Sequence, residues 1–457
     1  MGRMLLIEKE LENQTNVHLG SNAHEVGLII GQLSEIRDYA IHLARCPDPE
    51  DDAVEVEVGE DGNNTTPSPP TRSGQRNAEA GIDSKWIVEH ARQVNRMLTG
   101  GLSVVGVYMI ATAEVFTQSQ TKLKQCLHII QKKIENSKVL KNKHMVHQDK
   151  YLLHICQASR RFTCRSIDAS DDQSSLKPVE FRVQSFLENW KSVEACVDIN
   201  VQSFVPMNQE VLRTQQKIVY ACQKEIDRIW NSRAVSGYKV IDEKKPLVVE
   251  TKGKSKSSQV DDIKISLFKD SNGLTNKLHV ATDSVGSQVK FVGSIVAKAF
   301  LHPKSTYGDA IRALKTDAVR SLLTRIELLS EETEVNNLCQ QNEWSLLSPA
   351  RVFGAFKKYN ISFCDYLFKD ESEMDSIRRF SELLNIPGCQ LDFPEQSPDA
   401  SVASMLLLGE KSVDHLSDVA SEISINCIEE PRDKKIVAIG VAALTALLAV
   451  TVHLLST

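Results

Sequence analysis

The C-terminal end of the sequence carries the feature that most restricts how this chain can fold. Twenty consecutive residues, from Ile436 to Leu455, contain no charge. A helix of that length is about 30 Å long, which is the thickness of the hydrocarbon core of a bilayer. A helix buried in a soluble core would be expected to carry polar interruptions and to be followed by more chain. The segment therefore predicts a transmembrane helix.

The residues that flank this segment predict its orientation. Arg432, Lys434 and Lys435 precede it, and only two uncharged residues follow it. Because positively charged flanks stay on the cytosolic side of a membrane, we expect residues 1–435 to be cytosolic. A span this close to the C-terminus has to be inserted after translation, as a tail anchor is. Its minimal length and alanine-rich composition favour a thin membrane such as that of the endoplasmic reticulum.

The overall composition excludes several classes of protein. The 54 basic and 60 acidic residues give a net charge of −6, so the chain has no global positive field that would hold nucleic acid. Ten cysteines are scattered without any CxxC pair, which is typical of reduced cytosolic thiols and excludes a zinc ribbon. His154 and Cys156 would share one face of a strand, but a buried thiol beside a histidine explains that pattern better than a nucleophile pair.

Residues 1–232 predict an α/β domain in which helices flank a mixed sheet. Short apolar runs indicate strands, and apolar residues at helical spacing indicate amphipathic helices; one of these helices begins at the N-cap candidate Ser84 and ends before Gly100. Residues 48–83 are poor in apolar residues and predict a disordered insertion. The expected strands are 26–33, 39–45, 102–111, 151–156, 162–167, 181–186 and 193–205, and the expected helices are 84–98, 121–135 and 208–230.

The remainder of the cytosolic part predicts a second unit. Residues 233–262 contain a Lys/Ser/Gly-rich stretch and are expected to be a linker. A smaller α+β module should follow at 263–391, with strands at 263–268 and 289–302 and a helix at 309–329. Residues 392–435 have two prolines near the start and repeated Ser, Asp and Glu, and they predict a flexible tether to the anchor.

Three stretches resemble the odorant-response-abnormal protein four family: GLIIGQLSEIRDYAIHLARCP, KWIVEHARQVNRMLTGGLSVVGVYMIA and LLHICQASRRFTCRS. The second of them, from residue 85 to residue 111, is the most specific. This resemblance implies a tail-anchored protein of the endoplasmic reticulum that assists the maturation of polytopic receptors. It also implies a partnership with the protease of the ubiquitin-fold modifier pathway, and an N-terminal domain of the MPN type.

The resemblance to MPN domains can be examined residue by residue. Active MPN domains are zinc isopeptidases, in which two histidines of an HxH motif and an aspartate bind zinc and a glutamate activates water. If Gly106 to Tyr108 lie on the matching strand, Met109 and Ala111 occupy the histidine positions and Lys122 occupies the aspartate position. Glu25 lies near the glutamate position, and the sequence contains no HxH motif. We therefore expect a pseudoenzyme without a cofactor or metal.

Together these patterns predict a non-enzymatic scaffold that recruits a cytosolic partner to the membrane and supports receptor maturation. The candidate partner surface is the exposed face of the helix at 84–98, with Trp86, Glu89, Arg92 and Arg96. Two alternatives stay open. One is a chaperone-like export factor that contacts polytopic receptors directly, and the other, from a different class, is a cryptic hydrolase.

Overall fold

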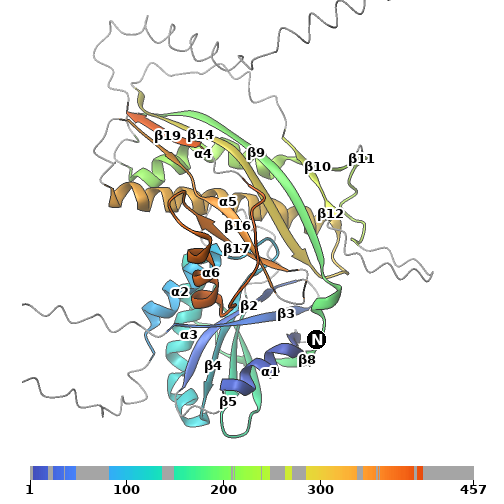
Figure 1. Ribbon diagram of the computed structural model, residues 1–457. Coiled ribbons are helices and arrows are strands. Elements are labelled where there is room, and N and C mark those ends of the chain that lie inside the picture. The colour runs from blue at the N-terminus through green and yellow to red at the C-terminus, as the bar shows by residue number, and fades with distance from the viewer. Residues whose placement is uncertain are drawn as a thin grey trace, which may run out of the picture.

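Two β-sheets, one of eight strands and one of five, organise the chain in the computed structural model (Figure 1). They lie in two bodies, one above the other in this view, with helices packed against each sheet. The structure describes residues 4–18, 24–34, 37–47, 82–135, 149–206, 209, 212–237, 239–247, 263–269, 285–336, 343–356, 359, 361–395 and 399–404.

The eight-stranded sheet is mixed and comes from the N-terminal part of the chain. Its central strand pairs confirm the predicted mixed sheet, since β2 lies antiparallel to β3 and β4, and β4 lies parallel to β5. The sheet order is β7-β6-β5-β4-β2-β3-β1-β8. The bounds are β1 (Met4–Glu8), β2 (Glu25–Gln32), β3 (Asp38–Arg45), β4 (Ser103–Ala111), β5 (Asp149–Cys156), β6 (Phe162–Asp168), β7 (Lys177–Pro178) and β8 (Glu180–Gln184).

Helices cover both faces of this sheet. Helices α2 (Ser84–Arg96) and α3 (Ala113–Glu135) share one hydrophobic core with one face, whereas Leu11 of α1 (Lys9–His18) packs into the core on the other. Asp83 is the N-cap of α2, because its side chain accepts hydrogen bonds from the amides of Lys85 and Trp86. The cap is thus one residue earlier than the predicted Ser84.

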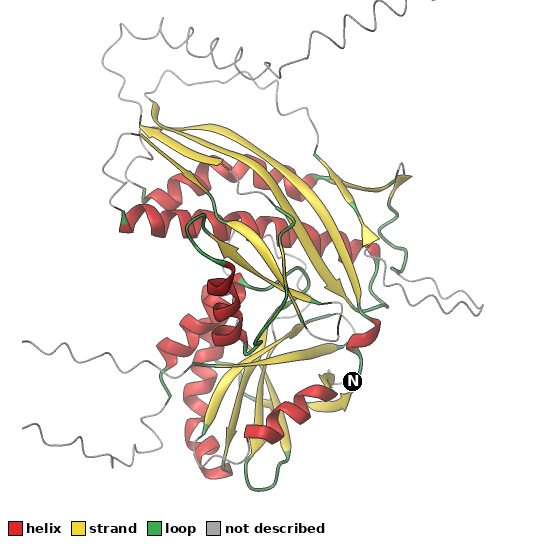
Figure 2. Cartoon of the chain, in the orientation of Figure 1, coloured by secondary structure: helices red, strands yellow, loops and turns green. Residues whose placement is uncertain are grey.

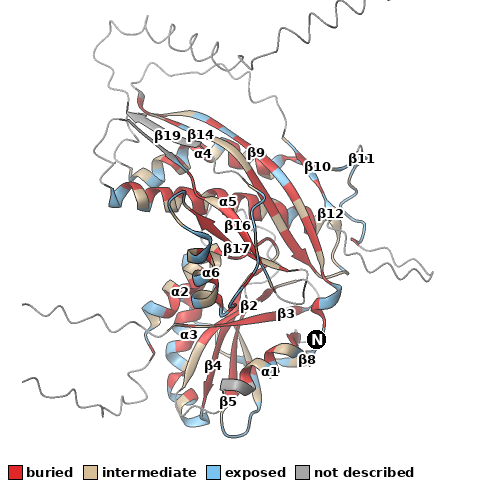
Figure 3. Ribbon diagram, in the orientation of Figure 1, coloured by how far each residue is buried: buried red, intermediate tan, exposed pale blue. Residues whose placement is uncertain are grey.

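The five-stranded sheet is built on one pair of long antiparallel strands. Strands β9 (Lys191–Pro206) and β14 (Val285–Leu301) run antiparallel along their whole length. Buried and exposed residues alternate along β9, visible as alternating colours in Figure 3, so one face of the sheet is buried. Helices α4 (Thr214–Asn231) and α5 (Tyr307–Val335) cover that face (Figure 2). The sheet order is β12-β9-β14-β19-β15, with β12 (Ile263–Lys264), β15 (Glu343–Leu347) and β19 (Asp399–Ser404).

Smaller elements complete the fold. One three-stranded sheet contains β10 (Arg233–Ser236), β11 (Lys239–Val240) and β13 (Ser266–Phe268). Another contains β16 (Ala350–Ala355), β17 (Ser362–Leu367) and β18 (Leu391–Asp392). Helix α6 (Glu373–Leu384) follows β17 and packs on the N-terminal body, because Phe380 and Leu384 belong to the same core as α2 and α3.

The structure corrects the predicted division of the chain. The boundary at residue 232 would assign β9 and α4 to the first domain, but both belong to the second sheet and its core. Local composition does not reveal which strands pair, and the partner of β9 lies about ninety residues later. The helix expected from residue 208 begins at Thr214. The linker expected at 233–262 contains β10 and β11.

The predicted tether is wrong over its first part. Residues 399–404 form β19 inside the five-stranded sheet, and the side chain of Glu395 is fully buried. The rest of the tether, the anchor from Ile436 to Leu455 with Arg432, Lys434 and Lys435, and residues 48–81 of the insertion lie outside the described residues. In the part of the chain that the structure does describe, no helix is long and apolar enough to cross a membrane.

Two buried histidines hold the C-terminal end of α6 against the first body. His42 of β3 donates from Nε2 to the carbonyl of Leu384, and His90 of α2 donates from Nε2 to that of Leu383. Carbonyls at the end of a helix have no partner within the helix, so these rings act as a cap. Burial lowers the pKa of both His42 and His90 from 6.5 to about 4. Both rings are therefore neutral in the folded protein at neutral pH.

We expect the stability of the protein to fall between about pH 7 and about pH 5. A histidine whose pKa is lowered on folding binds a proton more readily when the chain is unfolded, so its contribution is complete above pH 6.5 and is lost as the pH falls towards 4. Each ring should remove about 2 kcal/mol of unfolding free energy by pH 5. Thermal unfolding of the full chain across this range measures the effect.

The matched control is His42→Gln with His90→Gln, in which the amide still donates a hydrogen bond but does not titrate. The double variant should lose much of the pH dependence. An unchanged pH profile in the double variant would contradict this assignment.

Candidate functional site

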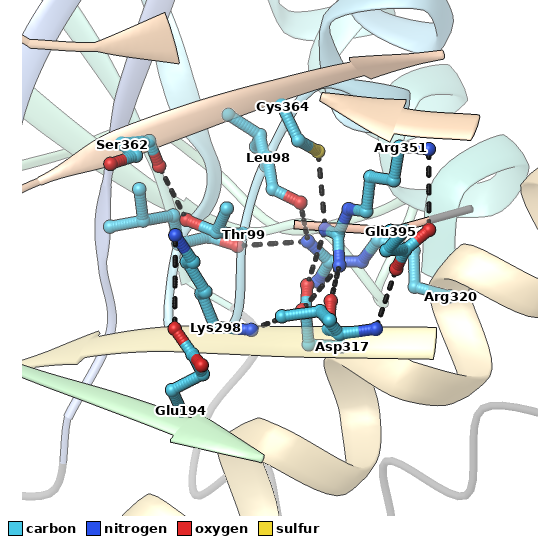
Figure 4. A network of polar contacts seen from close by, with 12 residues as sticks. Leu98, Thr99, Glu194, Lys298, Asp317, Arg320, Arg351, Ser362, Cys364 and Glu395 are labelled. Atoms are coloured by element: carbon cyan, nitrogen blue, oxygen red, sulfur yellow. Dashed lines mark hydrogen bonds and ion pairs between the residues drawn. The ribbon is translucent and has the colours of Figure 1, made fainter. Parts of the chain in front are cut away.

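A tight turn at residues 97–102 joins the two bodies and is the centre of the candidate site (Figure 4). This turn follows α2 and precedes β4, within the sequence block that carries the family resemblance. It bonds through its backbone to the second sheet: the Gly100 amide donates to the carbonyl of Lys298 at 2.8 Å, and the Phe300 amide donates to the carbonyl of Gly100 at 3.0 Å. We call residues 97–102 the junction turn.

The two glycines of the junction turn are required by close contact between backbones. A Cβ atom at Gly100 would lie 2.6 Å from the carbonyl oxygen of Ala313 and 2.9 Å from the Cβ of Ala299. Gly101 has a φ of +83°, and its Cβ position lies 2.6 Å from the carbonyl oxygen of Phe300. Only glycine combines that backbone angle with such a close approach. The helix ends before Gly100, as the sequence predicts, but the contacts of both glycines with the second sheet and α5 are not visible in the sequence.

Groups from two further elements, β17 and β2, also hold the junction turn. Thr99 donates from its hydroxyl to the carbonyl of Ser362 at 2.9 Å, and the amide of Cys364 donates to the carbonyl of Met97 at 2.8 Å. Gln32, at the end of β2, donates to the carbonyls of both Gly101 and Phe300. The turn is thus bound to β14, β17 and β2 at once.

Arg320 of α5 reaches the junction turn from the second body. Its Nη1 atom donates to the carbonyls of Leu98 at 3.1 Å and Leu102 at 3.3 Å. Those carbonyls follow the C-terminal end of α2, where a positive charge is favoured. Burial lowers the pKa of Arg320, and the carboxylate of Asp317 opposes that shift.

A buried ion pair lies next to Arg320 (Figure 4). Arg351 of β16 donates from Nη1 and Nη2 to the two oxygens of Asp317 at 2.7 and 2.9 Å, and from Nη2 to the thiol of Cys364 at 3.1 Å. Burial acts to lower the pKa of Arg351, but Asp317 raises it well above its usual value. Removing one partner of such a pair leaves a buried charge and costs about 3–5 kcal/mol.

The structure places the predicted partner residues Arg92 and Arg96 at the same junction. Arg92 pairs with Glu327 at 2.5 Å, and Arg96 pairs with Glu327 at 3.0 Å and with Glu331 at 2.8 Å, so α2 and α5 are joined by ion pairs. This differs from their predicted role, because these cations are bound within the chain. The sequence does not reveal it, since the glutamates lie more than two hundred residues away.

The other two predicted partner residues lie nearer the start of α2. Glu89 bonds to Arg92, which lowers the pKa of its carboxyl group. Trp86 is 36% exposed, and its indole donates to the carbonyl of Pro47 at 2.7 Å. Of the four, Trp86 is the side chain that offers an apolar surface to a partner.

The positions compared with zinc ligands lie in different surroundings. Met109 and Ala111 are fully buried on β4, and Lys122 is exposed on α3. Glu25 accepts a hydrogen bond from the hydroxyl of Tyr108 at 2.6 Å. Within the described ranges no group of three or more His, Cys, Asp or Glu residues is placed to hold a metal ion.

A cysteine–histidine contact that sequence reasoning missed lies under α2. The sulfur of Cys46 is 3.1 Å from Nδ1 of His90, across 44 residues of chain. Burial raises the pKa of the Cys46 thiol to about 12 and lowers that of His90 to about 4. Both shifts oppose the thiolate–imidazolium pair that a nucleophile needs, so this contact is structural.

A polar hollow of about 540 Å³ lies beside α1. Glu8, Lys9, Glu10, Glu188 and Tyr359 line part of it. Glu8 is already engaged, because its carboxylate accepts hydrogen bonds from the amides of Phe186 and Leu187. This lining is unlike the apolar wall of a typical small-molecule pocket.

The fold and the junction define a two-sheet α/β protein held together by a buried turn, and comparison with known proteins gives its family. A model of the odorant response abnormal 4-like family matches residues 27–392. The chain belongs to this family.

Relatives match over most of the chain. It is 28% identical to the human protein odr-4 homolog, over 92% of this chain and 91% of that protein, and 27% identical to the Xenopus tropicalis protein odr-4 homolog, over 87% of each. The odorant response abnormal protein 4 of Caenorhabditis elegans is 23% identical, over 67% of this chain and 64% of that protein. Among solved structures, UfSP from C. elegans matches with a TM-score of 0.39 and 13% identity; the match covers 84% of this chain and spans 57% of that one.

Gly100→Ala should destabilise the protein by roughly 1–3 kcal/mol, because the added methyl group meets backbone atoms that cannot rotate away. Thermal unfolding of the full chain measures this loss. The control is Gly237→Ala, where φ is +59° but nothing lies within 4 Å, so it reports backbone strain without a steric contact. A loss at Gly100 no larger than that at Gly237 would contradict the close contact.

Arg96→Glu should weaken the junction, since it places a third negative charge beside Glu327 and Glu331. We expect a loss of about 1 kcal/mol for these partly exposed charges and recovery when Glu327→Arg is added. Double-mutant analysis of thermal unfolding measures the coupling. If Arg96 instead only contacted a partner protein, Arg96→Glu would leave the stability of the chain unchanged. Adding Glu327→Arg would then give no recovery of stability.

Proposed function

We propose that this protein is a non-enzymatic adaptor that is anchored in the endoplasmic reticulum membrane through its C-terminus and recruits the cytosolic protease of the ubiquitin-fold modifier system. One observation carries the proposal: the chain belongs to the odorant response abnormal 4-like family over residues 27–392, and its sequence continues to the uncharged segment from Ile436 to Leu455. By recruiting the protease, the protein supports the maturation of membrane receptors.

The name of the nematode relative supports the link to receptors. That protein is called odorant response abnormal protein 4, and loss of receptors at the cell surface would produce such a defect. The partnership with the protease rests on the family resemblance found in the sequence.

We propose that the N-terminal body acts as an MPN-like pseudoenzyme. Met109 and Ala111 fill the core at the positions compared with zinc-binding histidines, and a thioether and a methyl group cannot replace imidazole ligands. Lys122, at the position compared with the aspartate, carries the same sign of charge as the metal.

An anchored adaptor works by raising the effective concentration of its partner at the membrane. A partner held by the cytosolic body searches in two dimensions instead of three, and no new contact with the client is needed. The exposed Trp86 at the start of α2 is the residue of the predicted surface that we propose for partner contact. Arg432, Lys434 and Lys435 hold the body on the cytosolic side.

Affinity purification tests the proposal. The full-length protein, solubilised from membranes with detergent, is compared with a version truncated after Pro431, and bound proteins are identified by mass spectrometry. We expect both versions to retain the same cytosolic protease near a one-to-one ratio, because the anchor sets only the location. Exchange of residues 436–455 for an unrelated anchor to the same membrane should preserve function.

Two outcomes would replace the proposal. If the truncated version loses every partner and the full-length protein retains polytopic receptors, the protein is a direct, chaperone-like export factor. If the purified cytosolic part contains stoichiometric zinc, it is a hydrolase, and the comparison of Met109, Ala111 and Lys122 with ligand positions is wrong.

A further inference from the structure

The last described part of the chain crosses the second body from one sheet to another. Leu391 and Asp392 form β18, which pairs with Gly354 and Phe353 of β16. Residues 399–404 form β19, which lies between β14 and β15 in the five-stranded sheet. We call the two described pieces, residues 391–395 and 399–404, the clasp.

One side chain fixes the clasp between its two strands. Glu395 forms an ion pair with Arg325 of α5, and both side chains are completely buried. Its other contacts are backbone amides: Val296 donates to Oε1 at 2.5 Å and Arg351 donates to Oε2 at 3.3 Å. The carboxylate thus occupies a built site with one guanidinium and two amide donors, beside the Asp317–Arg351 pair (Figure 4).

The clasp also holds β15 in the five-stranded sheet through strand pairing. In the sheet, β15 is the terminal strand and β19 is its neighbour, with five paired positions between them. On its other side β19 pairs with only six residues of β14, from Ser287 to Val292. Among the described strands β15 pairs with β19 alone, so loss of β19 would remove its strand pairing.

Most of the strand pairing and core packing in the rest of the second body does not involve the clasp. The other edge of β14 is paired with β9 from one end to the other. The core below this pair comes chiefly from β9, β14, α4 and α5, with residues such as Ile199, Phe291, Ile226 and Leu322. These elements keep their contacts with one another when six positions at the edge of β14 lose their partner.

We propose that the clasp is a releasable strap, which opens together with β15 while the β9–β14 pair and its two helices stay folded. Opening takes the Glu395 carboxylate out of its site and leaves Arg325 buried without its partner, so the closed state is strongly favoured. The release point is therefore the ion pair, and whatever neutralises or displaces that carboxylate opens the strap.

Release of the strap would increase the distance that the second body can lie from the membrane. The eleven residues of the clasp would join the chain that leads to the segment at 436–455, and eleven extended residues span at most about 40 Å. This consequence rests on the proposed membrane anchor, whereas release of the strap itself does not. The strap therefore gives the adaptor two tether lengths.

Hydrogen exchange of the full-length protein in detergent micelles, read by mass spectrometry, tests the strap. Glu395→Gln removes the charge that holds Arg325 and keeps the size of the side chain. We expect roughly 100-fold faster exchange of the amides in β15 and β19. Exchange in β4 and β5 of the first sheet should stay unchanged. The matched control is Glu382→Gln, at an exposed position on α6, which should change neither region.

A crosslink distinguishes release of the strap from general loosening. Lys290 and Ser401 are directly paired on β14 and β19, so Lys290→Cys with Ser401→Cys allows a disulfide across the two strands. In the Glu395→Gln background, oxidation should return β15 and β19 to slow exchange, and reduction should restore fast exchange.

Three results would overturn the proposal. These are exchange in β15 and β19 that Glu395→Gln leaves unchanged, exchange that rises equally in β4 and β5, and fast exchange that persists in the oxidised crosslinked variant. None of these readouts involves the protease or a native membrane. A failed adaptor function would therefore leave the exchange result intact, and the converse also holds.

Discussion

The approach of the junction turn to the second sheet is the contact on which the rest of the structure depends. Backbone meets backbone at Gly100, with Ala299 and Ala313 on the opposite side, and this leaves no room for a side chain. The amide of Gly100 donates to the carbonyl of Lys298, and the amide of Phe300 donates to the carbonyl of Gly100. Because hydrogen bonds are directional, these two fix both the distance and the angle between the two sheets. The ion pairs of Arg92 and Arg96 with α5 join the two bodies in the geometry that this contact gives.

The buried charges near the junction turn determine how the elements around them pack more than they raise the free energy of unfolding. Three arginines, at 320, 325 and 351, share two carboxylates, Asp317 and Glu395, in the interior of the second body. Apolar residues of similar volume would often be at least as stable, because burying ions carries a large desolvation cost. Fixed guanidinium groups, however, accept only one arrangement of the elements around them. The charges thus select one packing of α5, β16 and the clasp among several that an apolar core would tolerate.

Local patterns predicted most elements of the fold, and long-range pairing was what they missed. The strands at 26–33, 39–45 and 102–111 and the helix after Asp83 are confirmed within one or two residues, because their periodicity and caps are encoded locally. The assignment of β9 to the first domain was wrong. The sequence of residues 191–206 does not indicate that this strand pairs with β14. For the same reason the acidic partners of Arg96 and the burial of Glu395 could not be predicted from the sequence.

The start of β9 has a consequence for how the protein can be divided. Trp190 is buried in the core of the first sheet, the turn before it is held by the carboxylate of Glu8 from β1, and Lys191 already belongs to the second sheet. The last turn of the first body therefore runs directly into the longest strand pair of the second. Any cut between the two predicted domains would separate β9 from β14 and expose two long strand edges, which are prone to aggregate. Neither of the two predicted domains can therefore be expected to fold as a separate unit.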